Sequence, residues 1–422
     1  MGNPNLDVLV VGGSIGGISC ALALLKLGCK LTVLEKASSI TAAGAGIGLD
    51  ETSIKILQNL SDRKALEKSV MPMTSEANRA ILDGQARTIH QDDHWNHHSA
   101  HWSDIHQSLY RALPEGILHF CHTVVDVQQF EEGVTVTAEC GAASASNLDG
   151  PPQTHTYHPD LVVAADGSMS QTRQRLRPNE GRRYSGYCAW RGVVPVQEHP
   201  EVAAAVRAAY PDLHRRLYFD MAKDTHSVLY TLPGDRLNWL WYVNQAEPQL
   251  KGRSVTVKAD EQTIKEMHRS AAATFTPELA KLMQVTDKPF INAIYDREPL
   301  PQLVWDQVVL VGEAAHPTTP HGLRSTNMAL ADADQLRQSL EKHHCKIAPA
   351  LQDFQDARLD ATSTEVLFSR YLGQLKQGLL YPGQPVESWL QQPPSKQQEL
   401  GQASMGSFSM SNYKDQHLPP FS

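Results

Sequence analysis

The sequence has no apolar run approaching the roughly 18 residues of a membrane-spanning helix, and its N-terminus lacks the basic and apolar segments of a signal peptide. It also lacks long runs of lysine and arginine, and its net charge of −8 offers no electrostatic basis for binding nucleic acid. These absences predict a cytoplasmic protein with no membrane span and no nucleic-acid partner. The 422 residues, 41% of them hydrophobic, are enough for two or three lobes.

Paired cysteines of the CxxC type are missing as well. The six cysteines are scattered, and several lie in apolar runs where a free thiol behaves as a small hydrophobe, so we expect reduced thiols. Four histidines lie close together (His94, His97, His98 and His101), but neither a cysteine pair nor an HExxH helix accompanies them. We therefore expect no metal site, and interpret this segment as a solvated loop or a lid over a cleft.

A βαβ pattern is present at the N-terminus. Residues 6–11 form an apolar run typical of a buried parallel strand, and the run ends at a glycine turn. Residues 14–28 have the pattern of a helix, and residues 31–34 that of a second strand. This order of elements is the context in which a glycine turn binds a dinucleotide.

The turn itself carries most of the dinucleotide fingerprint. Gly12 and Gly17 occupy its first and sixth positions, whereas Ser14 replaces the third glycine. A serine still permits close approach of the backbone to a phosphate if its φ is negative. The first N–H groups of the helix would bind the pyrophosphate, and Glu35, at the end of the second strand, would accept both ribose hydroxyls of an adenosine.

Two later segments each follow a buried strand: residues 165–173 (Ala-Asp-Gly-Ser-Met-Ser-Gln-Thr-Arg) and 312–317 (Gly-Glu-Ala-Ala-His-Pro). With the first turn they resemble the three fingerprints of class A FAD-dependent monooxygenases, the para-hydroxybenzoate hydroxylase fold. The first of these two segments matches the whole of that family's Asp-Gly-x-x-Ser-x-x-Arg pattern. Residues 44–47 (Gly-Ala-Gly-Ile) also match the family loop whose backbone approaches the flavin.

The resemblance implies an α/β fold in which an antiparallel-sheet substrate domain is inserted into a Rossmann-like FAD-binding domain. The FAD-binding domain would comprise residues 1–183 and 291–390, and the inserted domain residues 184–290, whose strands are rich in aromatic residues. Residues 391–422 are rich in Gln, Ser and Pro, and we expect a poorly ordered tail there.

The same resemblance implies the chemistry. NADH or NADPH would reduce the flavin. Because no second G-x-G-x-x-G is present, there is no separate nicotinamide-binding domain, and the nicotinamide would bind only transiently. O₂ would react at flavin C4a, and the resulting hydroperoxide would hydroxylate an electron-rich aromatic or N-heteroaromatic small molecule. The residues implied in FAD binding are Gly12, Ser14, Ile15, Gly16, Gly17, Glu35, Lys36, Gly46, Ile47, Trp102, Val125, Asp166, Gly167, Arg173, Gly312, Glu313, Pro320, Ser325, Thr326 and Asn327.

Besides Ser14, the chain departs from the family pattern at three places. Glu313 replaces the aspartate that holds the ribityl chain, and Trp102 replaces an arginine that contacts FAD. Residues 323–325 (Leu-Arg-Ser) replace a glycine-rich turn near flavin N1 and O2. Trp102 and residues 187–192 (Tyr-Cys-Ala-Trp-Arg-Gly) are similar to the dihydroxypyridine hydroxylase branch, which departs at the same places.

The predicted substrate site is the cleft between the flavin lobe and the aromatic sheet. Strand alternation should turn about half of the aromatic side chains inward and leave the others as sheet core. The candidates for the cleft are Trp190, Tyr218, Tyr230 and Trp241.

The loop that contains Pro320 carries the catalytic candidates. His321 is either the substrate base or an exposed side chain, and Arg324 either pairs with the charge of reduced flavin or points to solvent.

The leading hypothesis is therefore an FAD-dependent aromatic hydroxylase that is a monomer or a homodimer. One alternative is an epoxidase or oxidase that acts on a larger apolar substrate. The other is a flavin-binding protein in which the Leu-Arg-Ser turn no longer supports hydroxylation.

Overall fold

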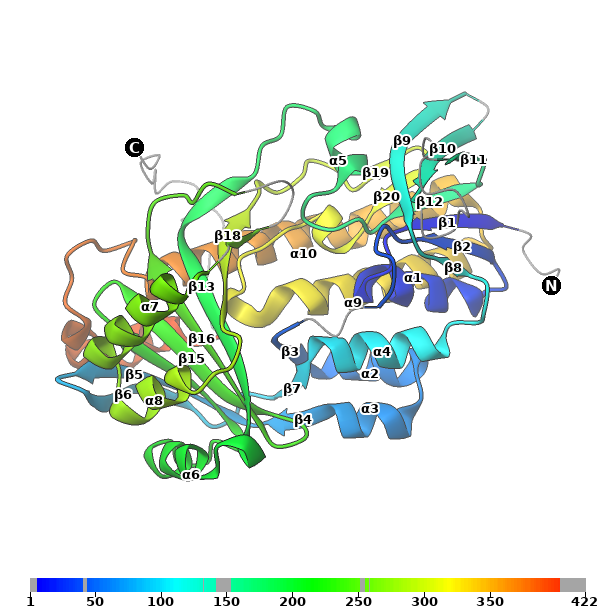
Figure 1. Ribbon diagram of the computed structural model, residues 1–422. Helices are drawn as coiled ribbons and strands as arrows, with labels where there is room; N and C mark the ends of the chain where they lie inside the picture. The colour runs from blue at the N-terminus through cyan, green and yellow to red at the C-terminus, as the bar shows by residue number, and fades with distance from the viewer. Residues whose placement is uncertain are drawn as a thin grey trace.

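The structure is a computed structural model, which describes residues 6–40, 44–131, 133–141, 153–250, 255–257 and 259–402. Within these ranges no helix combines the length and apolar character needed to cross a membrane. Figure 1 shows two main sheets lying side by side, with helices around and between them.

The first main sheet has six strands in the order β19-β20-β12-β1-β2-β8. Its strands are β1 (Asp7–Val11), β2 (Lys30–Leu34), β8 (Leu118–His119), β12 (Leu161–Ala164), β19 (Val304–Trp305) and β20 (Val308–Leu310). All neighbouring pairs are parallel except β19 with β20. This is the parallel sheet that the N-terminal βαβ pattern predicts.

Alternation along β1 explains how the sheet is covered. Val8 and Val10 pack in one core with residues of helix α1 (Ile15–Leu25) and helix α9 (Arg324–Lys342), whereas Leu9 and Val11 face a small second sheet. That second sheet comprises β9 (His122–Phe130), β10 (Gly133–Cys140) and β11 (Gln153–Tyr157). In Figure 1 it lies on the side of β1 opposite to α1 and α9. Both faces of the parallel sheet are therefore buried, as its apolar strands require.

The second main sheet has eight strands in the order β17-β18-β13-β16-β15-β14-β5-β6. Its strands are β5 (Ser75–Leu82), β6 (Gln85–Asp92), β13 (Arg183–Pro195), β14 (Arg216–Ala222), β15 (Thr225–Leu232), β16 (Arg236–Asn244), β17 (Thr256–Val257) and β18 (Phe290–Asp296). It extends beyond the predicted boundaries of 184 and 290. The reason is that β5 pairs in parallel with β14, far along the chain, and brings β6 with it.

Three helices cover one face of this sheet: α6 (Pro200–Ala209), α7 (Glu261–Thr274) and α8 (Pro277–Gln284) (Figure 1). The other face is turned toward the six-stranded sheet and carries a separate apolar cluster. Because side chains alternate along each strand, neighbouring residues of one strand belong to different cores.

A third group of elements lies beneath α1. It comprises helices α2 (Glu51–Leu60), α3 (Arg63–Ser69) and α4 (Trp102–Ala112) and the strands β3 (Gly46–Asp50), β4 (Val70–Met73) and β7 (His97–His101). The histidine-rich segment was predicted as a loop or lid, and this was wrong for residues 97–101. They form β7, the middle strand of a three-stranded sheet, because both β3 and β4 pair with them.

The C-terminal part begins with the long helix α10 (Ile347–Lys376), followed by short helices η5 (Val386–Gln391), α11 (Pro394–Gln397) and η6 (Gln398–Leu400). The prediction of a poorly ordered tail from residue 391 was wrong for residues 391–402. Trp389 and Leu400 are buried in a core with residues of β5, β6 and α10, which holds this segment on the sheet. The remainder of the predicted tail, residues 403–422, lies outside the described residues.

Candidate functional site

The glycine turn after β1 leaves no room for side chains at two positions. Gly12 has φ +105°, and a Cβ there would lie 2.4 Å from the carbonyl oxygen of Ala165. A Cβ on Gly17 would lie 1.9 Å from the carbonyl oxygen of Gly12. The turn therefore needs glycine at both positions, one for its backbone conformation and one for the packing of the helix on the strand.

The start of helix α1 is open to an anion. Its N-cap is Ser14, with φ −81° in the extended region and no hydrogen bond from the Ser14 side chain to the helix. The first N–H groups of the helix therefore have no capping acceptor from this side chain, and the helix dipole adds partial positive charge there. This arrangement suits the pyrophosphate of a dinucleotide.

Glu35 is fixed beside that turn. One of its carboxylate oxygens accepts a hydrogen bond from the Gly13 N–H (2.7 Å) and the other from the Ala37 N–H (2.8 Å). Each oxygen keeps a lone pair for a ribose hydroxyl. The neighbouring Lys36 is exposed and does not line the cavity described below.

We expect Glu35→Ala to weaken FAD binding by about 1–3 kcal/mol, because a charge-assisted acceptor for the ribose is lost. The measurement is the dissociation constant of FAD from the apoprotein, followed by flavin fluorescence. Glu67→Ala, on the exposed surface of α3, is the matched control. Equal FAD affinity of the two variants would exclude the ribose role.

The second fingerprint segment builds the turn rather than the cavity wall. Asp166 accepts hydrogen bonds from the Ser170 hydroxyl (2.5 Å) and from the N–H groups of Gln171 (2.9 Å) and Thr172 (3.1 Å), at the start of helix α5 (Gln171–Leu176). Arg173 is buried, and burial lowers its pKa to about 10.

The guanidinium of Arg173 ties the second fingerprint segment to the third. It donates to the backbone carbonyls of Glu313 (3.1 Å), Ala314 (2.7 Å) and Ser168 (2.7 Å). Ala165 and Gly167 are the residues of the second fingerprint segment that reach the cavity.

The third segment is organised by Asp332 of α9. Its buried carboxylate accepts from the Gly312 N–H (2.8 Å), His316 Nε2 (2.6 Å) and the Arg358 guanidinium (2.8 Å). Glu313, which replaces the family aspartate, lines the cavity and accepts a hydrogen bond from the Ser325 hydroxyl (2.8 Å).

The Leu-Arg-Ser turn is accommodated by a glycine on β3. Leu323 adopts a left-handed conformation (φ +58°), and its side chain occupies the space that a Cβ on Gly48 would enter. Asn327 fastens the two elements together, because its Nδ2 donates to the Gly48 carbonyl (3.2 Å) and its Oδ1 accepts from the Asp50 N–H (3.1 Å). The substituted turn is therefore packed rather than loose.

These segments border one cavity of about 330 Å³ between the two main sheets. The predicted FAD-binding residues that line it are Ser14, Ile15, Gly16, Gly46, Ile47, Trp102, Gly167, Gly312, Glu313, Pro320, Ser325 and Thr326. Gly12, Gly17, Glu35, Lys36, Val125, Asp166, Arg173 and Asn327 are not among the lining residues. Several of these (Gly12, Gly17, Asp166, Arg173 and Asn327) shape the surrounding turns, while the Val125 carbonyl accepts a hydrogen bond from Arg175 (2.5 Å).

Trp102 occupies the place of the family arginine. It begins α4, its N–H donates to the Ala45 carbonyl (3.1 Å), and its ring stacks on His106 (4.7 Å between centroids). His106 in turn hydrogen-bonds the Gly13 carbonyl (2.7 Å), a link that the sequence did not indicate.

Gly46 has no room for a side chain, because a Cβ there would lie 2.3 Å from the Tyr230 hydroxyl.

The structure places one of the four predicted cleft aromatics in the cavity, Tyr230. Contrary to the prediction, Trp190, Tyr218 and Trp241 do not line the cavity. They lie on the opposite face of the eight-stranded sheet, in the core beneath α6, α7 and α8. The cavity wall is formed instead by residues one position out of phase, including Arg191, Phe219, Leu240 and Tyr242.

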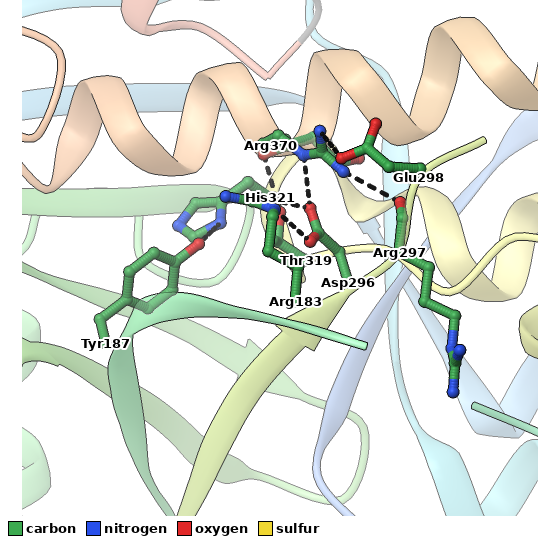
Figure 2. A network of polar contacts seen from close by, with 9 residues as sticks. Arg183, Tyr187, Asp296, Arg297, Glu298, Thr319, His321 and Arg370 are labelled. Atoms are coloured by element: carbon green, nitrogen blue, oxygen red, sulfur yellow. Dashed lines mark hydrogen bonds and ion pairs between the residues drawn. The ribbon is translucent and has the colours of Figure 1, made fainter. Parts of the chain in front are cut away.

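His321 lines the cavity but both of its ring nitrogens have protein partners. Gln377 donates its amide to Asn244 (2.8 Å), so its Oε1 accepts from His226 Nδ1 (2.7 Å) and leaves His226 Nε2 as an acceptor. His321 Nε2 then donates to His226 (3.2 Å), and Tyr187 donates to His321 Nδ1 (3.4 Å; Figure 2).

Burial and the nearby charges of Lys376 and Arg191 lower the pKa of His321 to about 3. The imidazole is therefore neutral and fully engaged, a poor arrangement for the substrate base.

The wall behind His321 is rigid. Figure 2 shows Tyr187 directed at the imidazole and, beyond it, Asp296 held between two arginines. Arg183 donates two bonds to this carboxylate (2.9 and 2.8 Å), and Arg370 donates a further one (2.7 Å). These bonds join β13, β18 and α10, and the Thr319 hydroxyl donates to the Ser369 carbonyl (2.7 Å), which holds the loop that carries Pro320 and His321 against α10.

Arg324 has a counter-charge within the protein and does not point freely into solvent. Its guanidinium forms an ion pair with Glu365 of α10 (2.9 Å), and it donates to the Gln402 carbonyl (3.2 Å). It also lines the cavity. Burial raises the pKa of Glu365, and Arg324 counteracts that effect.

Among the described residues, no group of three or more His, Cys, Asp and Glu side chains is arranged to hold a metal. His98 lines the cavity and His101 accepts the Ser103 N–H (3.3 Å) at the start of α4. These two histidines serve the wall and the helix start rather than a common site.

Comparison with known proteins agrees with this geometry. The FAD binding domain family matches residues 5–360. The chain belongs to the class A FAD-dependent aromatic hydroxylase family. It is 28% identical to the 3-hydroxybenzoate 6-hydroxylase of Polaromonas naphthalenivorans, covering 91% of this chain and 90% of that protein. It is 26% identical to the 2,6-dihydroxypyridine 3-monooxygenase of Paenarthrobacter nicotinovorans, covering 85% and 88%.

The fold is likewise shared with solved structures. HpxO of Klebsiella pneumoniae, solved with FAD and uric acid, matches with a TM-score of 0.77 and 23% identity over 96% of both chains. The predicted α/β fold with an FAD-binding sheet and an antiparallel sheet is therefore confirmed. So are membership of the monooxygenase family and FAD as its cofactor.

Proposed function

We propose that the protein hydroxylates an electron-rich aromatic or N-heteroaromatic small molecule, with NADH or NADPH as reductant and O₂ as oxidant. In this reaction one oxygen atom replaces a ring hydrogen as hydroxyl, the other leaves as water, and the nicotinamide is oxidised. FAD supplies the electron transfer and the activation of O₂ when it is bound. The residues of this chain bind the cofactor, orient the ring and exclude water.

The observation that carries the proposal is a cavity with two chemically different walls. One wall is formed by the fingerprint turns, including Ser14, Gly167 and Gly312, and the other by an aromatic and aliphatic sheet face that includes Phe219 and Tyr230. A flat ring placed against the second wall would lie next to whatever the first wall holds. The apolar face also keeps water away from the reacting atoms.

Tyr230 and Tyr242 are the hydroxyl groups best placed to orient a ring. Both residues line the cavity, and neither hydroxyl takes part in a hydrogen bond found among the described residues. Burial raises the pKa of each phenol, so both stay protonated and can donate. In this proposal they orient the ring as hydrogen-bond donors, which differs from the role of substrate base that the sequence suggested for His321.

The test is a screen of hydroxylated benzoates and pyridines for faster NAD(P)H oxidation by the FAD-loaded enzyme, with hydrogen peroxide measured in parallel. We expect at least one compound to accelerate oxidation and to appear as a hydroxylated product. Acceleration that yields only peroxide with every compound would contradict hydroxylation.

A pair of variants ties the activity to the cavity. Tyr230→Phe should lower kcat/KM by about tenfold, the effect of one lost hydrogen bond of roughly 1.4 kcal/mol. Tyr218→Phe is the matched control, because it removes a hydroxyl from the same sheet on the face beneath the helices, where it bonds the Pro211 carbonyl. Equal losses in both variants would place the effect in folding rather than in the cavity.

A further inference from the structure

Among the described residues, three indole, guanidinium or amide N–H groups around the cavity have neither a hydrogen-bond acceptor nor an ion-pair partner, and the ring nitrogen Nδ1 of His98 is also unpartnered. The three N–H groups are Nε1 of Trp95, Nε of Arg191 and Nε2 of Gln402. Trp95 is 3% exposed and Gln402 is 2% exposed, so bulk water does not satisfy them. Unpaired buried donors are costly, and donors that share a cavity are matched by a ligand with acceptor atoms.

Arg191 stands out among the arginines near the site. Arg173 is tied to backbone carbonyls, Arg183 and Arg370 to Asp296, and Arg324 to Glu365. None of the hydrogen bonds or ion pairs found between described residues involves the guanidinium of Arg191. Arg191 is half-buried, with its Nε fully covered, and it is a cation in the cavity wall without a counter-charge from the described part of the chain. A charge that is partly buried without a partner is unfavourable.

The position of Arg191 separates it from the fingerprint turns. It lies on β13, where it pairs with Leu240 of β16, and both residues line the cavity from the sheet side. Burial raises the pKa values of the Tyr230 and Tyr242 phenols, and the positive charge of Arg191 lowers them. The guanidinium therefore lies close enough to both phenols to act on them electrostatically. The pyrophosphate site is on the other wall, at the start of α1.

We propose that Arg191 binds a carboxylate carried by the aromatic substrate. This rests on the proposed function and narrows its substrate class to aromatic or heteroaromatic acids. The guanidinium can take a carboxylate with two parallel hydrogen bonds, which fixes the ring direction as well as its position. The unpaired N–H groups of Trp95 and Gln402 provide further donors in the same cavity for the acceptor atoms of the bound ligand.

The test compares acids with their amides in the FAD-loaded enzyme without NAD(P)H. The ligand pairs are hydroxybenzoates against hydroxybenzamides and 6-hydroxynicotinate against 6-hydroxynicotinamide, and binding is followed by the change in flavin absorbance. We expect the acid of a binding pair to bind more tightly than its amide. Arg191→Met should weaken acid binding by about 100-fold and amide binding by no more than about threefold, with unchanged FAD retention.

Two further variants sharpen the result. Arg191→Lys keeps the charge but not the two parallel hydrogen bonds, and should fall between the wild type and Arg191→Met. Arg269→Met, exposed on α7, controls for the loss of one positive charge.

The inference is overturned if amides bind as tightly as acids, if neither member of any pair binds, or if Arg191→Met releases FAD and weakens both ligands equally. Hydroxylation of neutral rings with no preference for acids would overturn the inference and leave the proposed function standing. Arg191-dependent binding of acids that are never hydroxylated would contradict the proposed function and leave the carboxylate-binding role of Arg191 standing.

Discussion

Gly17→Ala is expected to yield a protein that is purified without FAD. The added Cβ would lie 1.9 Å from the carbonyl oxygen of Gly12, and this atom belongs to the backbone, so no side chain can move to make room. Helix α1 must then shift away from the turn that presents its N–H groups to the pyrophosphate. We expect FAD affinity to fall by at least about 100-fold, more than 2.7 kcal/mol.

Gly181→Ala is the control for this prediction. A Cβ on Gly181 meets no atom within 4 Å, and Gly181 does not line the cavity, so helix α1 and the FAD site can stay in place. The measurements are the flavin-to-protein ratio after gel filtration and the far-ultraviolet circular dichroism of each variant. A folded Gly17→Ala protein with the flavin content of wild type would show that the close packing of turn and helix is not needed for FAD binding.

The second large effect is on stability. Asp332→Asn is expected to lower the free energy of unfolding by about 3–5 kcal/mol, because Arg358 and His316 lose the buried carboxylate that they share. Asp334→Asn, two residues along α9, weakens partly exposed contacts with Arg337 and Gln338 and should cost less than about 1 kcal/mol. Urea unfolding of the two variants measures the difference.

This stabilisation should depend on pH in a defined direction. Burial alone would raise the pKa of Asp332, but His316, Arg358 and the Gly312 N–H lower it well below its usual range. The contribution is thus complete above the carboxyl pKa of the unfolded chain, about 3.9, and is lost as the pH falls through the folded-state pKa. The stability gap between wild type and Asp332→Asn should be constant from neutral pH to about pH 5 and shrink below about pH 4. A gap that instead widens in acid would contradict the role of the charged carboxylate.

The sequence predicted those parts of the site that depend on local backbone geometry. Gly12, Gly17 and Asp166 lie at turns whose shape is set within a few residues, so their spacing is informative on its own. The same holds for the apolar strand β1 and the helix that follows it. The sequence also singled out residues 323–325 as an altered turn, whereas the fit of Leu323 against Gly48 depends on a distant strand.

The parts that were missed depend on contacts between distant segments. Strand alternation implied that half of the aromatic side chains of the sheet face the cavity, but it could not say which half. Trp190, Tyr218 and Trp241 lie on the other face because the helices α6 to α8 cover that face and form a core with them. The parallel pairing of β5 with β14 and the partners of His321 likewise join residues far apart in the sequence. No local pattern carries that information.

The proposed activity is the transfer of oxygen from O₂ to an aromatic ring. The most direct measurement supplies ¹⁸O₂ to the FAD-loaded enzyme with NAD(P)H and a compound that accelerates NAD(P)H oxidation, and determines the label in the product by mass spectrometry. We expect one ¹⁸O atom in the new hydroxyl group of the ring for each NAD(P)H consumed under full coupling. Label found only in hydrogen peroxide or water, with an unlabelled or unchanged ring, would contradict it.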